Sequence, residues 1–224
     1  MNRELTNIEK QKVIDEKTKQ ILSLLGIKKS FRVLNQLAST LKLYKYIFQK
    51  ADSSFAKTIP DINTDDKNDR YLHDLYVGLT HNPGTPTTNT IVFKHLLMHS
   101  IAESEVVLLK STKSGRSHLA NIVKLGKEYY YFDPTLERSI FDDDTWEENQ
   151  KTLCCAAIGK NDDYFKLYKP IGALPDDMNM PLKQLPDNIS EDSMSKSLVN
   201  EIASLIPDYS RTGFKEQNED YGER

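Results

Sequence analysis

Two apolar stripes at helical spacing dominate the first quarter of the chain. The first follows Thr6 and Glu9, which fit a capping box, and ends near Gly26. The second starts near Ser30 and contains Phe31, Leu34, Leu37, Ala38, Leu41, Tyr44 and Phe48. Because the other positions of both segments are largely polar, we expect two amphipathic helices that each bury one face in a core.

Helical spacing returns after a polar connector. Residues 51–69 are rich in Asp and contain Pro60, which predicts a loop, and a short helix is expected over about 70–79. A turn-rich segment then leads into a central helix that we expect Thr87 or Thr88 to cap. The apolar positions of this central helix are Ile91, Val92, Leu96, Leu97 and Ile101.

Strand-like segments follow these helices. They are Glu105–Leu109, 117–125, 127–132, Leu153–Ile158 and Tyr164–Tyr168. The short turn at Gly126 favours antiparallel pairing of the strands on either side of it. Helices followed by a run of short strands are typical of an α+β fold. We therefore expect N-terminal helices and a central helix packed on an antiparallel sheet of about four or five strands.

The distribution of apolar, polar and proline residues divides the chain into three segments. Residues 1–69 predict a helical N-terminal region packed on the core, and residues 70–170 predict the core itself. Residues 171–224 are punctuated by proline and polar residues, so we expect a tail that is partly helical, around Ser197–Ile206, and partly mobile.

Composition and charge narrow the classes of partner and compartment. The formal net charge is −3 over 224 residues, so no strong basic field favours nucleic acid or an anionic membrane. No apolar run approaches the length of a membrane span, and no signal sequence is visible at the N-terminus. The only cysteines, Cys154 and Cys155, are adjacent and poorly placed to bond each other. We expect a cytoplasmic protein, and its oligomeric state stays open.

His118 and Asp133 are the residues most suggestive of chemistry. His118 lies near the start of one expected strand, and Asp133 follows the end of the next. Neighbouring strands of this kind can bring an imidazole and a carboxylate together, which is the orienting half of a nucleophile–His–Asp triad. The same pair can equally be a satisfied structural contact without catalytic use.

The sequence around this pair resembles the transglutaminase-like branch of the papain-like cysteine hydrolases. The matching text runs from His118 through Asn121 to Val123, and then from Tyr129 to Thr135 across Asp-Pro-Thr. A weaker likeness extends upstream to about residue 70. The resemblance implies an α+β core and a catalytic cysteine at the start of the central helix, where the helix dipole and the histidine favour thiolate.

No cysteine stands at the position that the resemblance implies. Thr85, Pro86, Thr87 and Thr88 occupy that turn, and residues 1–153 contain no cysteine. A threonine hydroxyl at Thr87 or Thr88 is a far weaker nucleophile and needs strong general-base help. The resemblance therefore predicts a degenerate member of the family.

Three hypotheses about function follow. The first is a catalytically inactive domain that binds a peptide or protein in the vestigial cleft, with Thr85, Asn121 and Tyr130 as ligand-binding residues. The second is an acyl-transfer or peptide-hydrolase enzyme that uses His118 as base, Asp133 as orienter and a threonine nucleophile. The third is a structural or regulatory protein that uses its N-terminal helices as an interface.

Two further clusters have mainly structural interpretations. His95 and His99 share a helix face at a spacing that suits a metal, but no third ligand lies on that helix, so we expect neither a metal nor a cofactor. Lys110, Lys113 and Arg116 form a small basic loop before His118. A solvated hairpin tip explains this loop, and contact with an acidic ligand is the alternative.

Overall fold

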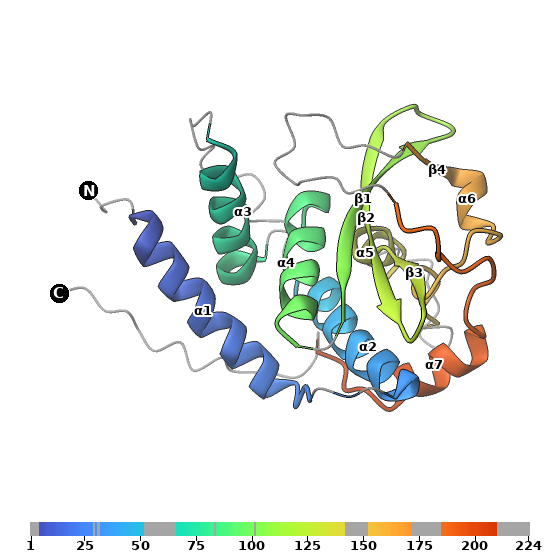
Figure 1. Ribbon diagram of the computed structural model, residues 1–224, viewed down its shortest axis with the longest axis horizontal. Helices are drawn as coiled ribbons and strands as arrows, with labels where there is room; N and C mark the ends of the chain where they lie inside the picture. The colour runs from blue at the N-terminus through green and yellow to red at the C-terminus, as the bar shows by residue number, and fades with distance from the viewer. Residues whose placement is uncertain are drawn as a thin grey trace.

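A four-stranded antiparallel sheet forms the centre of the molecule. The computed structural model describes residues 5–28, 30, 32–51, 66–82, 84–100, 102–141, 152–171 and 185–209. Within these residues the strands follow the order β3-β2-β1-β4, and Figure 1 shows α4 on one side of the sheet and α6 on the other. The strands are β1 (Ser104–Ser111), β2 (Ser117–Leu125), β3 (Glu128–Phe132) and β4 (Tyr168–Pro170). The expected α+β fold is confirmed.

Seven helices accompany this sheet in the described part of the chain. They are α1 (Asn7–Leu24), α2 (Val33–Lys50), α3 (Lys67–His81), α4 (Pro86–Met98), α5 (Pro134–Phe141), α6 (Tyr164–Leu167) and α7 (Lys196–Ser204). The capping box of Thr6 and Glu9 is present at the start of α1. Among the described residues, no helix combines the length and the apolar character needed to cross a bilayer.

The cap of the central helix differs from the sequence expectation. Thr85, not Thr87 or Thr88, is the N-cap of α4, and its hydroxyl accepts a hydrogen bond from the Thr88 backbone N–H. Pro86 then occupies the first helical position, where its missing N–H costs nothing. The position of this proline fixes the helix start two or three residues earlier than expected.

The two expected C-terminal strands are also wrong. Leu153–Ile158 is irregular, because the N–H groups of Cys154 and Cys155 donate to the Glu137 carboxylate instead of to a neighbouring strand. Only Ile158 pairs with the sheet, through a bridge to Tyr131. Tyr164–Leu167 is the short helix α6, and β4 begins only at Tyr168.

The two faces of the sheet bury different cores. On the α4 side, alternate residues of β2 such as Leu119 and Val123 join a large cluster that includes Phe93 and Phe132 and extends to α1, α2, α3 and α7. On the other side, Ala120 and Ile122 belong to a smaller cluster with Val107, Leu109, Tyr129, Tyr131, Cys155, Ile158, Tyr164 and Ile189. Strand alternation thus assigns each residue of β2 to one of two environments.

The described part of the C-terminal tail packs on the core. Ile189 forms a parallel bridge with Tyr129, so this segment covers part of the β3 edge. Gly159 lies so close to the Asp192 backbone that a Cβ at position 159 would clash with it. The helix α7 contacts α2, and its residues Val199 and Ala203 join the larger core. Residues 172–184 and 210–224 of the tail, and the acidic segment 142–148, lie outside the described residues.

Candidate functional site

The structure brings His118 and Asp133 together. The ring nitrogen Nε2 of His118 lies 2.6 Å from Oδ2 of Asp133. His118 is the second residue of β2, and Asp133 directly follows β3, whose last residue, Phe132, pairs with Asn121. The antiparallel pairing of β2 and β3 therefore creates the contact, as expected from the sequence.

Three donors hold the Asp133 carboxylate. Besides His118, the Tyr164 hydroxyl donates to Oδ2 at 2.8 Å, and the Leu136 backbone N–H donates to Oδ1 at 2.9 Å in the first turn of α5. The residue has no solvent exposure. Because an ionised carboxylate only accepts hydrogen bonds, this network assigns the proton of the His118–Asp133 contact to Nε2 of the imidazole.

This arrangement leaves Nδ1 of His118 as the ring nitrogen available to a ligand. No hydrogen bond within the described part of the chain involves Nδ1, and the side chain is 13% exposed. The ring packs against Tyr168 with centroids 4.8 Å apart. In the neutral ring Nδ1 accepts a hydrogen bond, and in the protonated ring it donates one. The site therefore presents one oriented polar atom at the protein surface.

A second buried hydrogen-bond network includes the backbone carbonyl of Asp133. The Tyr44 hydroxyl lies 2.8 Å from Oε2 of Glu137, 3.0 Å from the Asp133 carbonyl and 2.9 Å from the Cys155 carbonyl. Glu137 also accepts from the N–H groups of Cys154 and Cys155. Burial raises the pKa of Glu137 to about 7, although these hydrogen bonds oppose the rise. Tyr44 and Glu137 thus tie α2, α5 and the 153–155 segment together around Asp133.

Both cysteines lie in surroundings that disfavour the thiolate form. Burial raises the pKa of the Cys155 thiol far above its ordinary value, and nearby Glu137 and Asp133 add to the effect. Burial and Glu137 also raise the pKa of Cys154. Thiolate is the reactive form of cysteine, so both residues are held in the unreactive form.

The threonines at the start of α4 are not brought to the histidine. Oγ1 of Thr88 lies 2.9 Å from Oγ1 of Thr85 and donates to the Thr85 carbonyl, whereas none of the hydrogen bonds described for Thr85, Thr87 or Thr88 reaches His118 or Asp133. The helix α4 packs on the Leu119 and Val123 face of β2, while His118 alternates with them onto the other face. The sheet therefore separates the expected nucleophile position from the expected base.

The other expected ligand-binding residues have structural contacts. Asn121 is fully buried, and its amide donates to the Thr90 carbonyl at 2.9 Å, which ties β2 to α4. Tyr130 is 8% exposed, and its hydroxyl donates to Glu128 at 3.0 Å on the α4 side of the sheet. Asn121 supports the strand that carries His118, as expected, but it has no surface to offer a ligand.

His95 and His99 belong to a packing contact. Nε2 of His95 lies 2.9 Å from the Thr18 hydroxyl, which donates its own proton to the Ile14 carbonyl, so His95 is the donor. The centroids of the His95 and His99 rings lie 4.1 Å apart. Within the described residues, no group of three His, Cys, Asp or Glu side chains is arranged to hold a metal.

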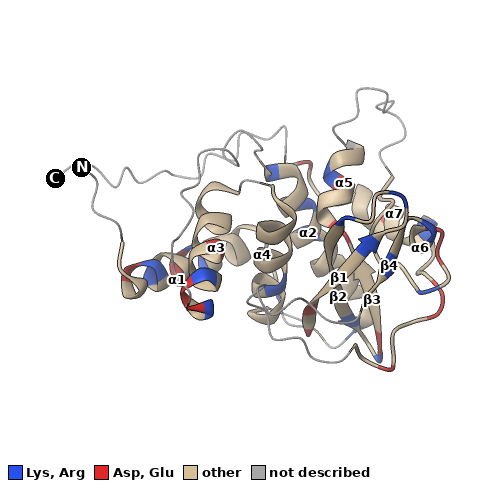
Figure 2. Cartoon of the chain, turned by 90° about the horizontal axis from the view of Figure 1, so that it is seen from above, with Lys and Arg blue, Asp and Glu red and all other residues tan. Residues whose placement is uncertain are grey.

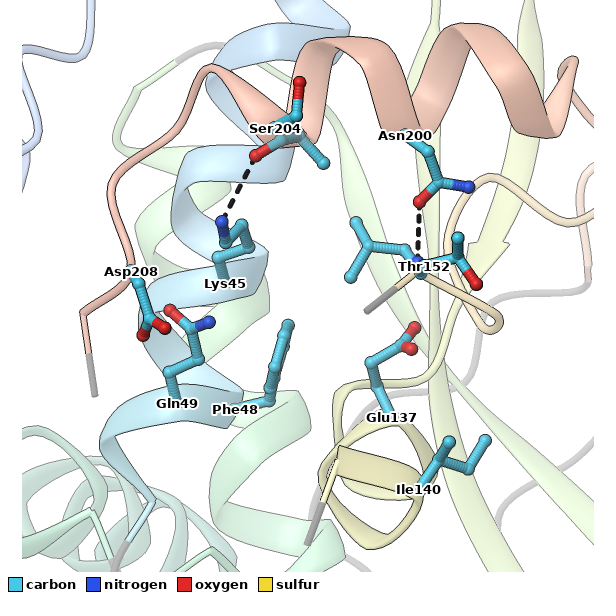
Figure 3. Close-up of a pocket in the computed structure, with 11 residues that line it drawn as sticks. Lys45, Phe48, Gln49, Glu137, Ile140, Thr152, Asn200, Ser204 and Asp208 are labelled. Carbon is cyan, nitrogen blue, oxygen red and sulfur yellow. Dashed lines mark hydrogen bonds between the residues drawn. The ribbon is translucent and has the colours of Figure 1, made fainter. Parts of the chain in front are cut away.

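A cavity of about 250 Å³ lies between α2, α5 and α7, as Figure 3 shows. Its walls include Phe48, Glu137 and Ile140, with Lys45 and Asn200 at its polar side. These polar groups already have partners: Lys45 donates to the carbonyls of Ala203 and Ile206, and Asn200 accepts from the Leu153 N–H. The polar contacts attach α7 and the 153–155 segment to the core.

Sequence reasoning missed the residues that complete the network around the histidine. Tyr164 is expected in a strand but lies in α6, where its hydroxyl donates to the Asp133 carboxylate. Tyr168 lies in the strand β4, as expected, and its ring packs on His118, a contact that the sequence does not predict. Glu137 had no sequence signal, because its burial depends on the fold of the 153–155 segment. Tyr44 was expected only as a core residue of the second apolar stripe.

Comparisons of this chain with protein-family models, with curated proteins and with solved structures gave no match.

Proposed function

We propose that this chain is a catalytically inactive transglutaminase-like domain that binds a peptide or protein segment beside the His118–Asp133 pair. One observation supports this proposal above the others. The imidazole is fixed by a buried carboxylate, yet no hydroxyl or thiol in the described residues hydrogen bonds to its remaining nitrogen. The orienting half of a triad is present without a nucleophile.

The geometry of the histidine suits recognition. The His118 side chain is 13% exposed, Nδ1 has no hydrogen-bond partner among the described residues, and the Tyr168 ring that packs on His118 is half-buried. A backbone N–H of a peptide can donate to Nδ1, and an apolar side chain can pack on the tyrosine. Because Asp133 and Tyr168 hold the ring in place before binding, little conformational entropy is lost when the ligand arrives.

The proposal is tested by selecting ligands from a phage-displayed library of random dodecapeptides. Selected peptides are labelled with fluorescein, and their affinity is measured by fluorescence polarisation. We expect His118→Ala to weaken binding at least tenfold, which corresponds to loss of about one hydrogen bond in a desolvated site. Replacement of the exposed His81 by Ala is the matched control and should leave the affinity unchanged.

Three results would contradict the proposal. Equal affinity of the His118→Ala variant and the parent protein would remove the pair from the binding site. Loss of every selected ligand on deletion of residues 1–30, with His118→Ala neutral, would favour the helical interface instead. Release of ammonia from a glutamine-containing peptide and an amine, abolished by His118→Ala and by Thr87→Val, would establish the acyl-transfer enzyme.

A further inference from the structure

Four cations gather at the end of the sheet where β1, β2 and β4 meet. Lys110 in β1 lies directly opposite Lys169 in β4, and Lys113 and Arg116 belong to the hairpin between β1 and β2. All four residues are exposed. In Figure 2 the ribbon is coloured blue for Lys and Arg at several places around β1 and β4. We call these four residues the cationic end.

The cationic end lacks acidic partners in the described part of the chain. Lysines elsewhere have them: Lys94 pairs with Glu105 at 2.8 Å, and Lys124 pairs with Glu103 at 3.1 Å. The α6 residue Lys166 pairs with Asp163 at 2.7 Å. Among the described residues, no ion pair or hydrogen bond involves the ammonium or guanidinium groups of Lys110, Lys113, Arg116 and Lys169; Arg116 bonds Ser114 only through its backbone N–H. The contrast is informative because acidic residues outnumber basic ones in the chain, 33 to 30.

The opposition of Lys110 and Lys169 is unfavourable by itself. Residues directly opposite in an antiparallel pair place their side chains on the same face of the sheet, about 5 Å apart at Cβ, and like charges there repel each other. An acidic group between the two ammonium groups would replace this repulsion by two attractions. The register of β1 and β4 thus creates a site for a carboxylate.

The β4 edge does not recruit a partner as an extra strand. Pro170 has no backbone N–H, and the Tyr168 N–H already donates to the Tyr164 carbonyl. The Lys169 residue lies in register with Lys110 of β1. A strand edge with so few free donors resists strand addition, so recognition at this end depends on side-chain charge.

We infer that the cationic end docks an acidic segment of a partner protein, with Asp or Glu carboxylates placed between Lys110 and Lys169 and against Arg116. Four cations match a short acidic segment, whereas specific nucleic-acid contacts commonly neutralise about six to ten phosphates. The net charge of −3 opposes approach to an extended polyanion or an anionic membrane. Strand alternation puts Lys110 on the opposite sheet face from Leu109 and His118, so this surface is separate from the histidine site.

The test uses the full chain and two fluorescein-labelled dodecapeptides, one of alternating Glu and Ser and one of alternating Gln and Ser. We expect the acidic peptide to bind at least tenfold more tightly at 50 mM salt, and this preference to shrink at 300 mM salt. The double variant Lys110→Glu/Lys169→Glu should reduce the affinity for the acidic peptide to that for the neutral one. Lys12→Glu/Lys19→Glu on α1 changes the net charge equally and should keep the preference.

Each other outcome overturns the inference. Equal losses of affinity for the acidic peptide in the two double variants would show that binding depends only on the net charge of the protein. Tighter binding of a single-stranded DNA dodecamer or of phosphatidylserine vesicles, lost on Lys110→Glu/Lys169→Glu, would assign the surface to nucleic acid or membrane. His118→Ala should leave binding of the acidic peptide intact, because Lys110 and Lys169 lie on the opposite face of the sheet from His118. Failure of the inference about the cationic end would therefore be distinguishable from failure of the proposed peptide site at His118.

Discussion

His95 and His118 are both mostly covered by protein, one on each side of the sheet, and their partners differ. His95 donates to a hydroxyl, that of Thr18, and stacks against His99. His118 donates to a carboxylate, that of Asp133, which two further donors hold in place. The residue type is the same, so the partner decides what each imidazole can do.

The two rings also differ in their burial and in the groups beside them. Burial and the neighbouring His99 lower the pKa of His95 to about 4, so this ring stays neutral and acts as a packing element. His118 has the Asp133 carboxyl group beside Nε2, and its side chain is 13% exposed. An imidazole with an acid partner and an exposed nitrogen can meet a ligand, whereas His95 is enclosed by α1 and α4.

Removing the partner of each histidine should lower the free energy of unfolding by different amounts on the two sides of the sheet. Asp133→Ala leaves Tyr164 and His118 without an acceptor and uncaps the first turn of α5, so we expect a loss of about 3–5 kcal/mol in the free energy of unfolding. Thr18→Val removes only one neutral acceptor and should cost about 1–2 kcal/mol. Urea unfolding followed by circular dichroism measures both losses, and equal losses would contradict the distinction.

The pH dependence of stability should contain two opposing contributions. The folded pKa of His95 is below its ordinary 6.5, so the unfolded chain binds this proton first and stability falls as the pH drops from about 6.5 to 4. The folded pKa of Glu137 is above its ordinary 4.5, so the folded chain binds that proton first and stability rises as the pH drops from about 7 to 4.5. Each contribution is on the order of 3 kcal/mol, and they oppose each other.

Single variants should reveal the two slopes. Between pH 6.5 and 4.5, His95→Gln should turn the shallow dependence of the parent into a rise of stability on acidification, and Glu137→Gln should turn it into a fall. Urea midpoints at four pH values measure the effect. His118→Gln serves as the comparison on the other side of the sheet. If stability changes with pH in the same direction in the His95 and Glu137 variants, the two opposing contributions are wrongly assigned to these residues.

Replacing the tyrosines of the histidine site should change the free energy of unfolding by a smaller amount. Tyr164→Phe removes one donor to the Asp133 carboxylate, and the expected cost is about 1.5–2 kcal/mol because the acceptor is charged. Tyr168→Phe keeps the ring that packs on His118 and should leave stability unchanged. Nuclear magnetic resonance of the His118 ring should show a shifted signal in the Tyr164 variant alone, and a shift in both would argue against an anchoring role specific to Tyr164.

Local pattern was enough to predict the helices α1, α2, α3, α4 and α7 and the central strands, whereas α5 was not expected and α6 was expected as a strand. The apolar stripes of α1 and α2 and the alternation of β2 appear within single elements, and adjacent strands with a short turn between them were sufficient to bring His118 to Asp133. The start of α4 was misplaced, since Thr85, Thr87 and Thr88 are all acceptable caps and only the position of Pro86 distinguishes them.

The parts that sequence did not reveal depend on contacts between distant segments. Residues 153–158 have the composition of a strand, but a buried carboxylate from α5 accepts from the N–H groups of Cys154 and Cys155. The face to which His118 points follows from the register of β2 against β1, and a shift of one residue would reverse it. The pairing of Lys110 with Lys169 joins positions 59 residues apart and has no local signal.

The smallest expected effect concerns this lysine pair, and it distinguishes a binding surface from a neutral one. Lys169→Glu replaces a cross-strand repulsion by an attraction to Lys110, so the free energy of unfolding should rise by about 0.5 kcal/mol. Lys12→Glu on α1 is the control and should not produce this gain. A variant that is more stable yet binds the acidic peptide less tightly would show that the parent sequence gives up stability at this end for recognition. If Lys169→Glu changes neither property, the two ammonium groups do not interact, and the carboxylate site inferred between them loses its physical basis.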